Sequence, residues 1–238
     1  MNPIQKTART AGYLYLLMGL TAPIGLIYVP GSIVVLGDPS ATAMHLRTSE
    51  SLERMGIASE LFHQLVFAIL ALTLYRLLKG VGKSLARMML VLALFSVPIV
   101  FLNVLNEIAA LMLSNGANLL SAFDKGQLDA LAYFFLRLHG RGIDLATIFW
   151  GLWLFPFGVL VVQSGFIPRF LGVLLLIACF GNLAGAVTSL LLPGHAMQVS
   201  RAAMVLGFGE MPIVIWFLIW GARNIPSGKQ QTLDEADS

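Results

Sequence analysis

Four acidic residues in strongly apolar surroundings are the side chains best suited to chemistry. Glu60, Glu107, Asp144 and Glu210 each stand within or at the mouth of an apolar run, in a chain that is 58% hydrophobic. An ionisable side chain at the centre of a bilayer costs roughly 3 kcal/mol or more unless it faces a partner or a wet cavity. The four acids therefore mark a candidate site for acid–base chemistry or ligand binding.

A carboxylate and an imidazole share one helical face where Glu60 is followed three residues later by His63. Such pairs hold divalent metals in helical bundles, normally with a second pair of the same kind. The chain contains no second pair, so further ligands would come from Glu107, Asp144, Glu210 or His139. A divalent metal held by Glu60 and His63 is one hypothesis. The alternative is that both side chains only hydrogen-bond to neighbouring helices.

The stretch from His139 to Asp144, HGRGID, is the densest polar segment near a predicted membrane boundary. Its His and Asp could form a general base and an orienting carboxylate, whereas the helix dipole alone would also explain an Asp in a first helical turn. Glu210 stands beside a glycine and two residues before Pro212, where backbone can approach a ligand closely. The candidate catalytic residues are Glu60, Asp144, Glu210 and His139.

Other polar side chains accompany these acids and are candidates for binding a substrate. Arginines near the outer rim could neutralise the carboxylates or hold an anionic head group, although snorkelling to the interface also explains them. Amide side chains could contact a substrate or bridge helices. The candidate substrate-binding residues are Arg54, Asn103, Asn106, Glu107, Arg141 and Asn182.

Composition places these residues in a membrane. Charged residues make up 11% of the chain and the mean hydropathy is +0.83, whereas soluble domains are about 25% charged. The net charge of +3 is too small and scattered to indicate nucleic-acid binding, and the lone Cys179 excludes an intramolecular disulfide and a cysteine-based metal cluster. Expected partners are membrane lipid and a hydrophobic or amphipathic small molecule, and a homo-oligomer remains open.

The apolar runs predict an all-α polytopic bundle with six transmembrane helices, since about 20 apolar residues span the hydrocarbon core. Residues 1–221 form a single transmembrane domain and the polar tail 222–238 is expected to be disordered. The first apolar run lacks a small-residue cleavage site and is interpreted as a retained helix. The expected spans are 11–36, 55–78, 85–113, 142–163, 168–192 and 202–220.

The second long connection contains an amphipathic pattern. Apolar residues recur at helical spacing from Gln127 to His139, which predicts a helix on the outer membrane surface. The segment Gly140–Gly142 would then turn this helix into the fourth span. One continuous helix from Gln127 to Gln163 is the alternative.

Basic residues predict the orientation. Nine lie at the ends that include both termini, and six lie at the opposite ends, so the positive-inside rule places both termini in the cytoplasm. Depth, at about 1.5 Å per helical residue, then places Glu60, Glu107, Asp144 and Glu210 in the outer half or near the midplane. This shared depth predicts a polar cavity that opens outward.

Five segments occur in a characteristic order along the chain: Ser51–Glu60 (SLERMGIASE), Phe135–Asp144 (FLRLHGRGID), Ser164–Gly172 (SGFIPRFLG), Leu192–Gly194 (LPG) and Gly209–Glu210. Through these segments the chain resembles a family of bacterial multi-span membrane proteins of unknown function, DUF4386. The resemblance covers about residues 12–220 and implies a helical membrane protein of the bacterial inner membrane, without a mechanism.

Three functions remain open on the sequence. The leading hypothesis is that the protein binds a small or lipid-like substrate, which it could convert by acid–base or metal-assisted chemistry. Isoprenoid cyclisation is one example, since a carboxyl group kept neutral by desolvation can donate a proton. A proton-coupled transporter of a small molecule would use the same acids to carry the ion. A structural or regulatory membrane protein would need none of them individually.

The orientation is tested by reporter fusions. Fusions after Arg87 and at the C-terminus should read cytoplasmic, and a fusion near Asp124 should read external, because the basic residues favour the cytoplasmic side. Alkaline phosphatase and green fluorescent protein activities measure the two sides. A cytoplasmic reading near Asp124 would reverse the expected opening of the cavity.

Overall fold

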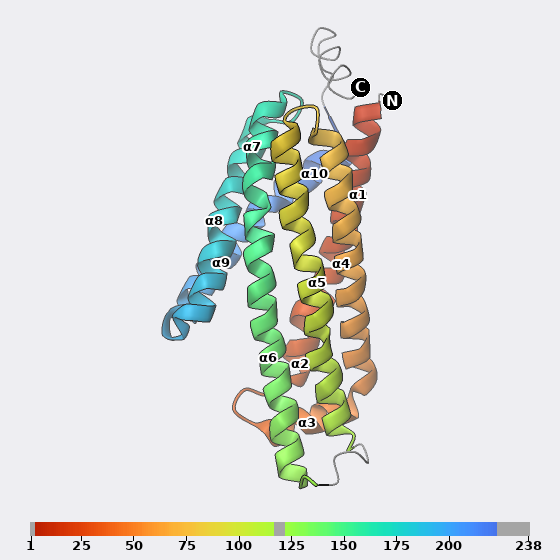
Figure 1. Cartoon of the computed structure of the whole chain (residues 1–238), viewed down its shortest axis with the longest axis vertical. Helices are drawn as coiled ribbons and strands as arrows, with labels where there is room; N and C mark the ends of the chain where they lie inside the picture. The colour runs from red at the N-terminus through yellow and green to blue at the C-terminus, as the bar shows by residue number, and fades with distance from the viewer. Residues whose placement is uncertain (1–2, 117–121, 223–238) are drawn as a thin grey trace. The chain divides into compact units, whose positions relative to one another are not determined.

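The computed structural model describes residues 3–116 and 122–222 and, within them, contains helices and no strand (Figure 1). Six helical runs are long and apolar enough to cross a membrane, and their bounds are Pro3–Ile33, Glu50–Leu78, Lys83–Ser114, Lys125–Ser164, Arg169–Leu191 and Pro193–Ile219. The predicted class, an all-α polytopic membrane protein with six spans, is confirmed. The predicted tail lies almost entirely outside the described residues.

Several spans consist of more than one helical element. The first contains α1 (Pro3–Pro23), the π-helical turn η1 (Ile24–Tyr28) and α2 (Val29–Ile33), and the fourth contains α6 (Lys125–Leu152) and α7 (Leu154–Ser164). The last contains two 3-10 turns, η3 (Pro193–His195) and η4 (Phe208–Glu210), with α9 (Ala196–Gly207) and α10 (Met211–Ile219). The remaining elements are α3 (Pro39–Thr48), α4 (Glu50–Leu78), α5 (Lys83–Ser114) and α8 (Arg169–Leu191).

The connection between the first two spans contains the helix α3, and α4 begins at Glu50, five residues before the expected start of the second span. The additional helix α3 begins after Asp38, whose Oδ1 accepts a hydrogen bond from the Ala41 N–H at 2.9 Å. Pro39 fills the first helical position, where its missing N–H costs nothing.

The fourth span takes the continuous form of the two that the sequence allowed. α6 runs from Lys125 through Gly140–Gly142 to Leu152, so residues 127–139 are its first half and form no separate surface helix. The interruption falls instead at Trp153, between α6 and α7. Glycine is tolerated inside a helix when its missing side chain permits a close contact, and Gly142 makes such a contact, as described below.

The chain divides into two compact units. The first unit comprises residues 1–17, 66–97 and 144–238, and the second comprises residues 18–65 and 98–143. The long helices α4, α5 and α6 each contribute one segment to either unit.

Aromatic packing and close helix contact form the core of the first unit. The ring of Trp153 stacks on Phe157 at 5.3 Å and meets Phe67 edge-on at 5.2 Å, and all three side chains are buried. α7 and α8 approach each other through Gly158 and Gly172. A Cβ on either glycine would lie 2.6–2.8 Å from the carbonyl oxygen of the other, so backbone packs directly on backbone.

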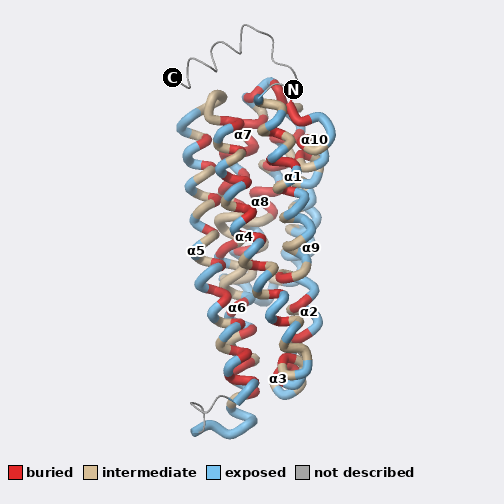
Figure 2. Tube along the Cα trace, turned by 90° about the vertical axis from the view of Figure 1, so that its right-hand side faces the viewer, coloured by how far each residue is buried: buried red, intermediate tan, exposed pale blue. Residues whose placement is uncertain are grey.

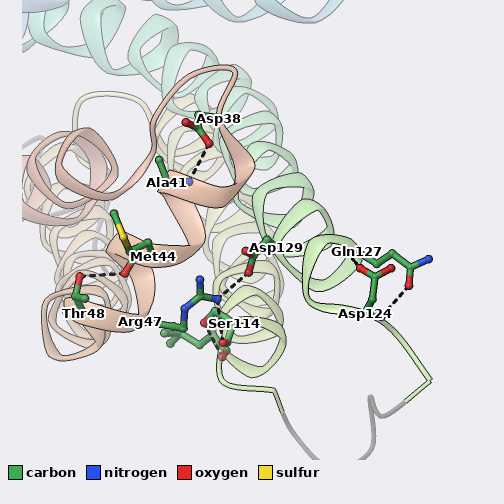
Figure 3. A network of polar contacts seen from close by, with 10 residues as sticks. Asp38, Ala41, Met44, Arg47, Thr48, Ser114, Asp124, Gln127 and Asp129 are labelled. Carbon is green, nitrogen blue, oxygen red and sulfur yellow. Dashed lines mark hydrogen bonds and ion pairs between the residues drawn. The ribbon is translucent and has the colours of Figure 1, made fainter.

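The second unit has an apolar core formed by η1–α2, α3, α5 and α6. It comprises Val29, Ile33, Leu46, Ala110, Leu111, Leu113, Ala132 and Leu136, with Leu52 and Ile57 of α4 packed against it. Figure 2 shows buried and exposed residues alternating along the helices, as expected for amphipathic packing. A polar network at the end of this unit joins α3 to α5 and α6 (Figure 3).

Adding a methyl group at the α7–α8 contact tests the packing of the first unit. Gly172→Ala should lower the free energy of unfolding by about 1–3 kcal/mol, because an added carbon in a filled contact forces the backbones apart. Thermal unfolding of the purified protein in detergent measures this. Gly19→Ala is the control, since a Cβ added there would have no neighbouring atom within 4 Å; an equal loss of stability at Gly19 would contradict the contact.

Candidate functional site

Three ionisable side chains from three helices meet inside the second unit. The Nε2 of His139 on α6 lies 3.3 Å from both carboxylate oxygens of Glu60 on α4 and 3.7 Å from Oε2 of Glu107 on α5. One potential ligand atom from each residue lies within 4.8 Å of the other two. The residues are 2%, 2% and 5% exposed for Glu60, Glu107 and His139. We call this group the carboxylate–histidine site.

An amide clamp between α5 and α6 sets the position of His139. The Asn103 Nδ2 donates a hydrogen bond to the His139 carbonyl oxygen at 2.9 Å, and Asn106 Nδ2 donates to Asn103 Oδ1 at 3.0 Å. The Asn103 carboxamide occupies the space that a Cβ on Gly142 would need. Asn103 and Glu107 lie four residues apart on α5 and therefore share one face, so the clamp places the imidazole against the carboxylates.

Glu60 is held from the opposite direction by the first span. Gly25, in the π-helical turn η1, lies against the Glu60 backbone and Cβ, as its own Cβ would be 3.3 Å from each. The Ser59 hydroxyl donates to the Thr21 carbonyl oxygen at 2.9 Å. π-helical turns often occur at functional sites because they displace the helix face locally.

The carboxylates have unused hydrogen-bonding capacity. Oε2 of Glu60 and Oε2 of Glu107 are buried and accept no hydrogen bond among the described residues. Both polar atoms of the Gln64 amide, one turn beyond Glu60, are also buried and have no hydrogen-bond partner in the part of the chain that the structure describes, and this residue is 0% exposed. Buried polar groups normally have partners because leaving one unpaired costs about 1–3 kcal/mol. A cation or bound protons would remove this cost.

The donor set suits a borderline divalent metal. Carboxylate oxygens and one imidazole nitrogen are ligands for Zn²⁺, Fe²⁺ or Mn²⁺. Three protein ligands leave a coordination position for water or a substrate, as in catalytic zinc sites.

Glu53 and Gln64 belong to the surroundings of this site and were not among the predicted site residues. Glu53 is 2% exposed and its Oε1 accepts no hydrogen bond among the described residues. Its spacing of seven residues from Glu60 was the available signal, since i and i+7 lie on one helical face.

Of the predicted site residues, Glu60, Glu107 and His139 form the site and Asn103 and Asn106 form the clamp. His63 is buried one turn from Glu60 but is not one of the three residues whose ligand atoms converge. Arg54, whose side chain is 64% exposed, pairs with Glu50 at 2.7 Å. Arg141 lies on α6 two residues after His139 and is half-buried.

The other predicted residues belong to the first unit. Asp144 accepts a hydrogen bond from the Ser189 hydroxyl at 2.6 Å. Glu210 ends the 3-10 turn η4 and lies close enough to Tyr15 to interact electrostatically. The Oδ1 of Asn182 on α8 lies beside Gly207. A common pocket for these residues and Glu60 stays a prediction.

The fold and the site define a polytopic membrane protein with a buried carboxylate–histidine group. The chain belongs to the family described as "Domain of unknown function (DUF4386)", which matches residues 10–221. It is 36% identical over 81 residues to an uncharacterized protein of Archaeoglobus fulgidus, and the match covers 34% of this chain and 47% of that protein. The chain thus spans about half the length of this curated relative. No solved structure matches the chain.

The amide clamp is tested by a pair of glycine variants on α6. Gly142→Ala should lower the free energy of unfolding by about 1–3 kcal/mol, because the methyl group displaces Asn103 and breaks its hydrogen bond to His139. Gly140→Ala, whose added Cβ would have no neighbouring atom within 4 Å, should be neutral or slightly stabilising because Ala favours helix. Thermal unfolding compares the two, and equal melting temperatures would rule out the clamp.

Proposed function

We propose that this protein binds one divalent transition-metal ion at Glu60, Glu107 and His139 and uses it on a small or lipid-like substrate within the membrane. The observation that carries the proposal is the convergence of three ligand atoms, from three helices, within 4.8 Å of one another. Helix packing alone does not require two carboxylates and an imidazole to meet at one buried point. Their meeting is unfavourable by itself, because like charges repel and desolvation disfavours the charged form of each group.

Charge balance supports a metal at this position. Two carboxylates and a neutral imidazole carry a charge of −2, so a divalent ion makes the group neutral overall. Neutrality matters here because an uncompensated charge in a low-dielectric interior costs several kcal/mol. The ion would also satisfy Oε2 of Glu60 and Oε2 of Glu107, which accept no hydrogen bond among the described residues.

The bound ion would supply Lewis-acid chemistry. A metal in a three-ligand site polarises a carbonyl or phosphoryl oxygen, or lowers the pKa of a bound water so that it becomes a nucleophile. The depth of the site within the spans favours a substrate that partitions into lipid. Under the predicted topology such a substrate would enter from the outer side.

Proton-coupled transport is a second candidate, and Glu53 is the observation that favours it. This third buried carboxyl group, beside Glu60 and Glu107, lies on the same helix as Glu60, with no hydrogen bond to its Oε1 among the described residues. Chains of intramembrane acids and His carry protons in pumps and transporters. In that case the site should bind no metal, and uptake in proteoliposomes should depend on the proton gradient.

The two candidates are separated by metal analysis of the purified protein. The wild type is incubated with Zn²⁺ or Co²⁺ and free ion is removed, after which mass spectrometry should find about one equivalent of bound metal. The variants Glu60→Gln, Glu107→Gln and His139→Gln should each weaken the metal affinity by about 10–100-fold or more, since losing even an outer-shell partner of a metal ligand has an effect of this size. Co²⁺ absorption would report the coordination directly.

Glu210→Gln is the matched control for this measurement. It removes an intramembrane acid of the same type from the first unit, so it should retain the full equivalent of metal. A wild type that binds none of Mn²⁺, Fe²⁺, Co²⁺ or Zn²⁺ above the Glu60→Gln background would reject the metal proposal.

A further inference from the structure

Polar contacts close the end of the second unit where α4 begins, α5 ends and α6 begins. Arg47 of α3 donates to Asp129 Oδ1 at 2.7 Å and to the Ser114 carbonyl oxygen at 3.4 Å (Figure 3). Glu50, at the start of α4, accepts from Arg54 at 2.8 Å and from Asn115 at 3.1 Å. We call this set of contacts the polar end.

The apolar core of the second unit separates the polar end from the carboxylate–histidine site. On α5, Leu111 lies one turn beyond Glu107 in the direction of the polar end, and on α6, Leu136 lies about one turn before His139 in the same direction. Both leucines belong to this core. An ion that moves from the polar end to the site must therefore pass an apolar layer, which opposes charge.

Glu53 lies at the level of this apolar layer. Its neighbours on α4, Leu52 and Ile57, pack against the core, and Glu53 itself is 2% exposed. It precedes Glu60 by seven residues, which is about 10 Å along the helix. Glu53 is close enough to Glu60 and His139 to interact electrostatically, and Glu107 also interacts with it.

A purely structural carboxylate at this level would be expected to have a partner for each oxygen. Oε1 of Glu53 instead accepts no hydrogen bond among the described residues, and burying an unpaired polar group is costly. The two arginines of the polar end have other partners, since Arg47 donates to Asp129 and Ser114 and Arg54 donates to Glu50. The position of Glu53 therefore needs a reason other than stability.

We propose that Glu53 is a transit ligand, which binds a divalent cation briefly as the ion moves from the polar end to Glu60, Glu107 and His139. This inference rests on the proposed function. A carboxylate midway through an apolar layer divides one high barrier into two lower ones, because it replaces part of the water that the cation loses. Glu50, partly exposed at the polar end, is a carboxylate that an arriving cation can reach.

On α4, the carboxylates that could receive the ion before Glu60 are Glu50 and Glu53, on the side of the polar end. Beyond Gln64, the buried face of α4 continues with Val66, Phe67, Leu70 and Ala71, which are 4% exposed or less. These apolar side chains offer a cation no further ligand on this helix. The ion is therefore loaded and released through the polar end and is held as a resident ion.

The experiment measures the rate and the affinity of Co²⁺ binding separately. Stopped-flow absorption follows Co²⁺ entry into the full-length protein in detergent, and equilibrium titration gives the affinity. Glu53→Gln should slow both the association and the dissociation of Co²⁺ by about tenfold or more. The affinity and the stoichiometry of one ion should stay at wild-type values, because a transit ligand lowers the barrier to entry and does not change the energy of the bound state. Glu53→Asp, which keeps the carboxylate, should restore most of the rate.

Each outcome decides the inference. Wild-type rates in Glu53→Gln would overturn the transit role and leave the proposed function standing. Loss of the bound ion in Glu53→Gln, with a normal elution profile, would show that Glu53 is a permanent ligand and also overturn it. Absence of Co²⁺ binding by the wild type would overturn the proposed function, and the inference with it. Should Glu53→Gln fail to fold, Glu53→Ala supplies the test, since it also removes the carboxylate: Co²⁺ entry should be slow in Glu53→Ala and close to the wild-type rate in Glu53→Asp, and equal rates in the two variants would overturn the transit role.

Discussion

The meeting of Glu60, Glu107 and His139 in a water-poor interior is the constraint on which the second unit depends. Two carboxylates cannot both stay charged at this separation in a low-dielectric medium without a compensating positive charge. Imidazole, a metal ion or bound protons can supply the compensation, and each choice gives the site a different chemistry. Because a charge left without compensation here costs several kcal/mol, the helices around the site must hold the three side chains in place.

The contacts around the site meet that requirement through backbone and amide groups. Asn106 orients Asn103, and Asn103 holds the backbone of His139. Gly142 leaves room for the carboxamide, so α6 can approach α5 at the residue where a side chain would prevent it. This contact gives Gly142 a role in helix packing, as small residues commonly have in membranes.

The arrangement of polar and apolar levels in the second unit connects packing with function. An apolar layer protects the site from water and strengthens every electrostatic interaction inside it. The same layer would isolate the site from its ion or proton supply, and Glu53 is buried on α4 between Leu52 and Ile57, which pack against that layer. The first unit relies on a different principle, since stacked aromatic rings and direct contact between glycines of α7 and α8 fill its core.

The sequence by itself determined the class of the fold and the identity of most of the site. Run lengths of apolar residues dictate six spans because hydrocarbon thickness sets the length of a helix, and the cost of a charge in lipid singled out Glu60 and Glu107. His139 was identified as a candidate base, but its expected partner was Asp144. The pairing with Glu60 arises from contacts between α4, α5 and α6 that no local pattern encodes.

Only the tertiary structure decided which polar residues meet and which helix breaks. Gly140–Gly142 has the local chemistry of a turn, yet a packing contact with Asn103 keeps it helical, and the break occurs at Trp153 instead. Glu53 stands in the first turn of α4, where an acid is common in sequence, and only the tertiary structure shows that it is buried. Local propensity and composition depend on residues that are close together in the chain. Burial and the choice of hydrogen-bond or ion-pair partners depend on residues that are far apart in it. For that reason the sequence indicated the residues of the site but not their arrangement.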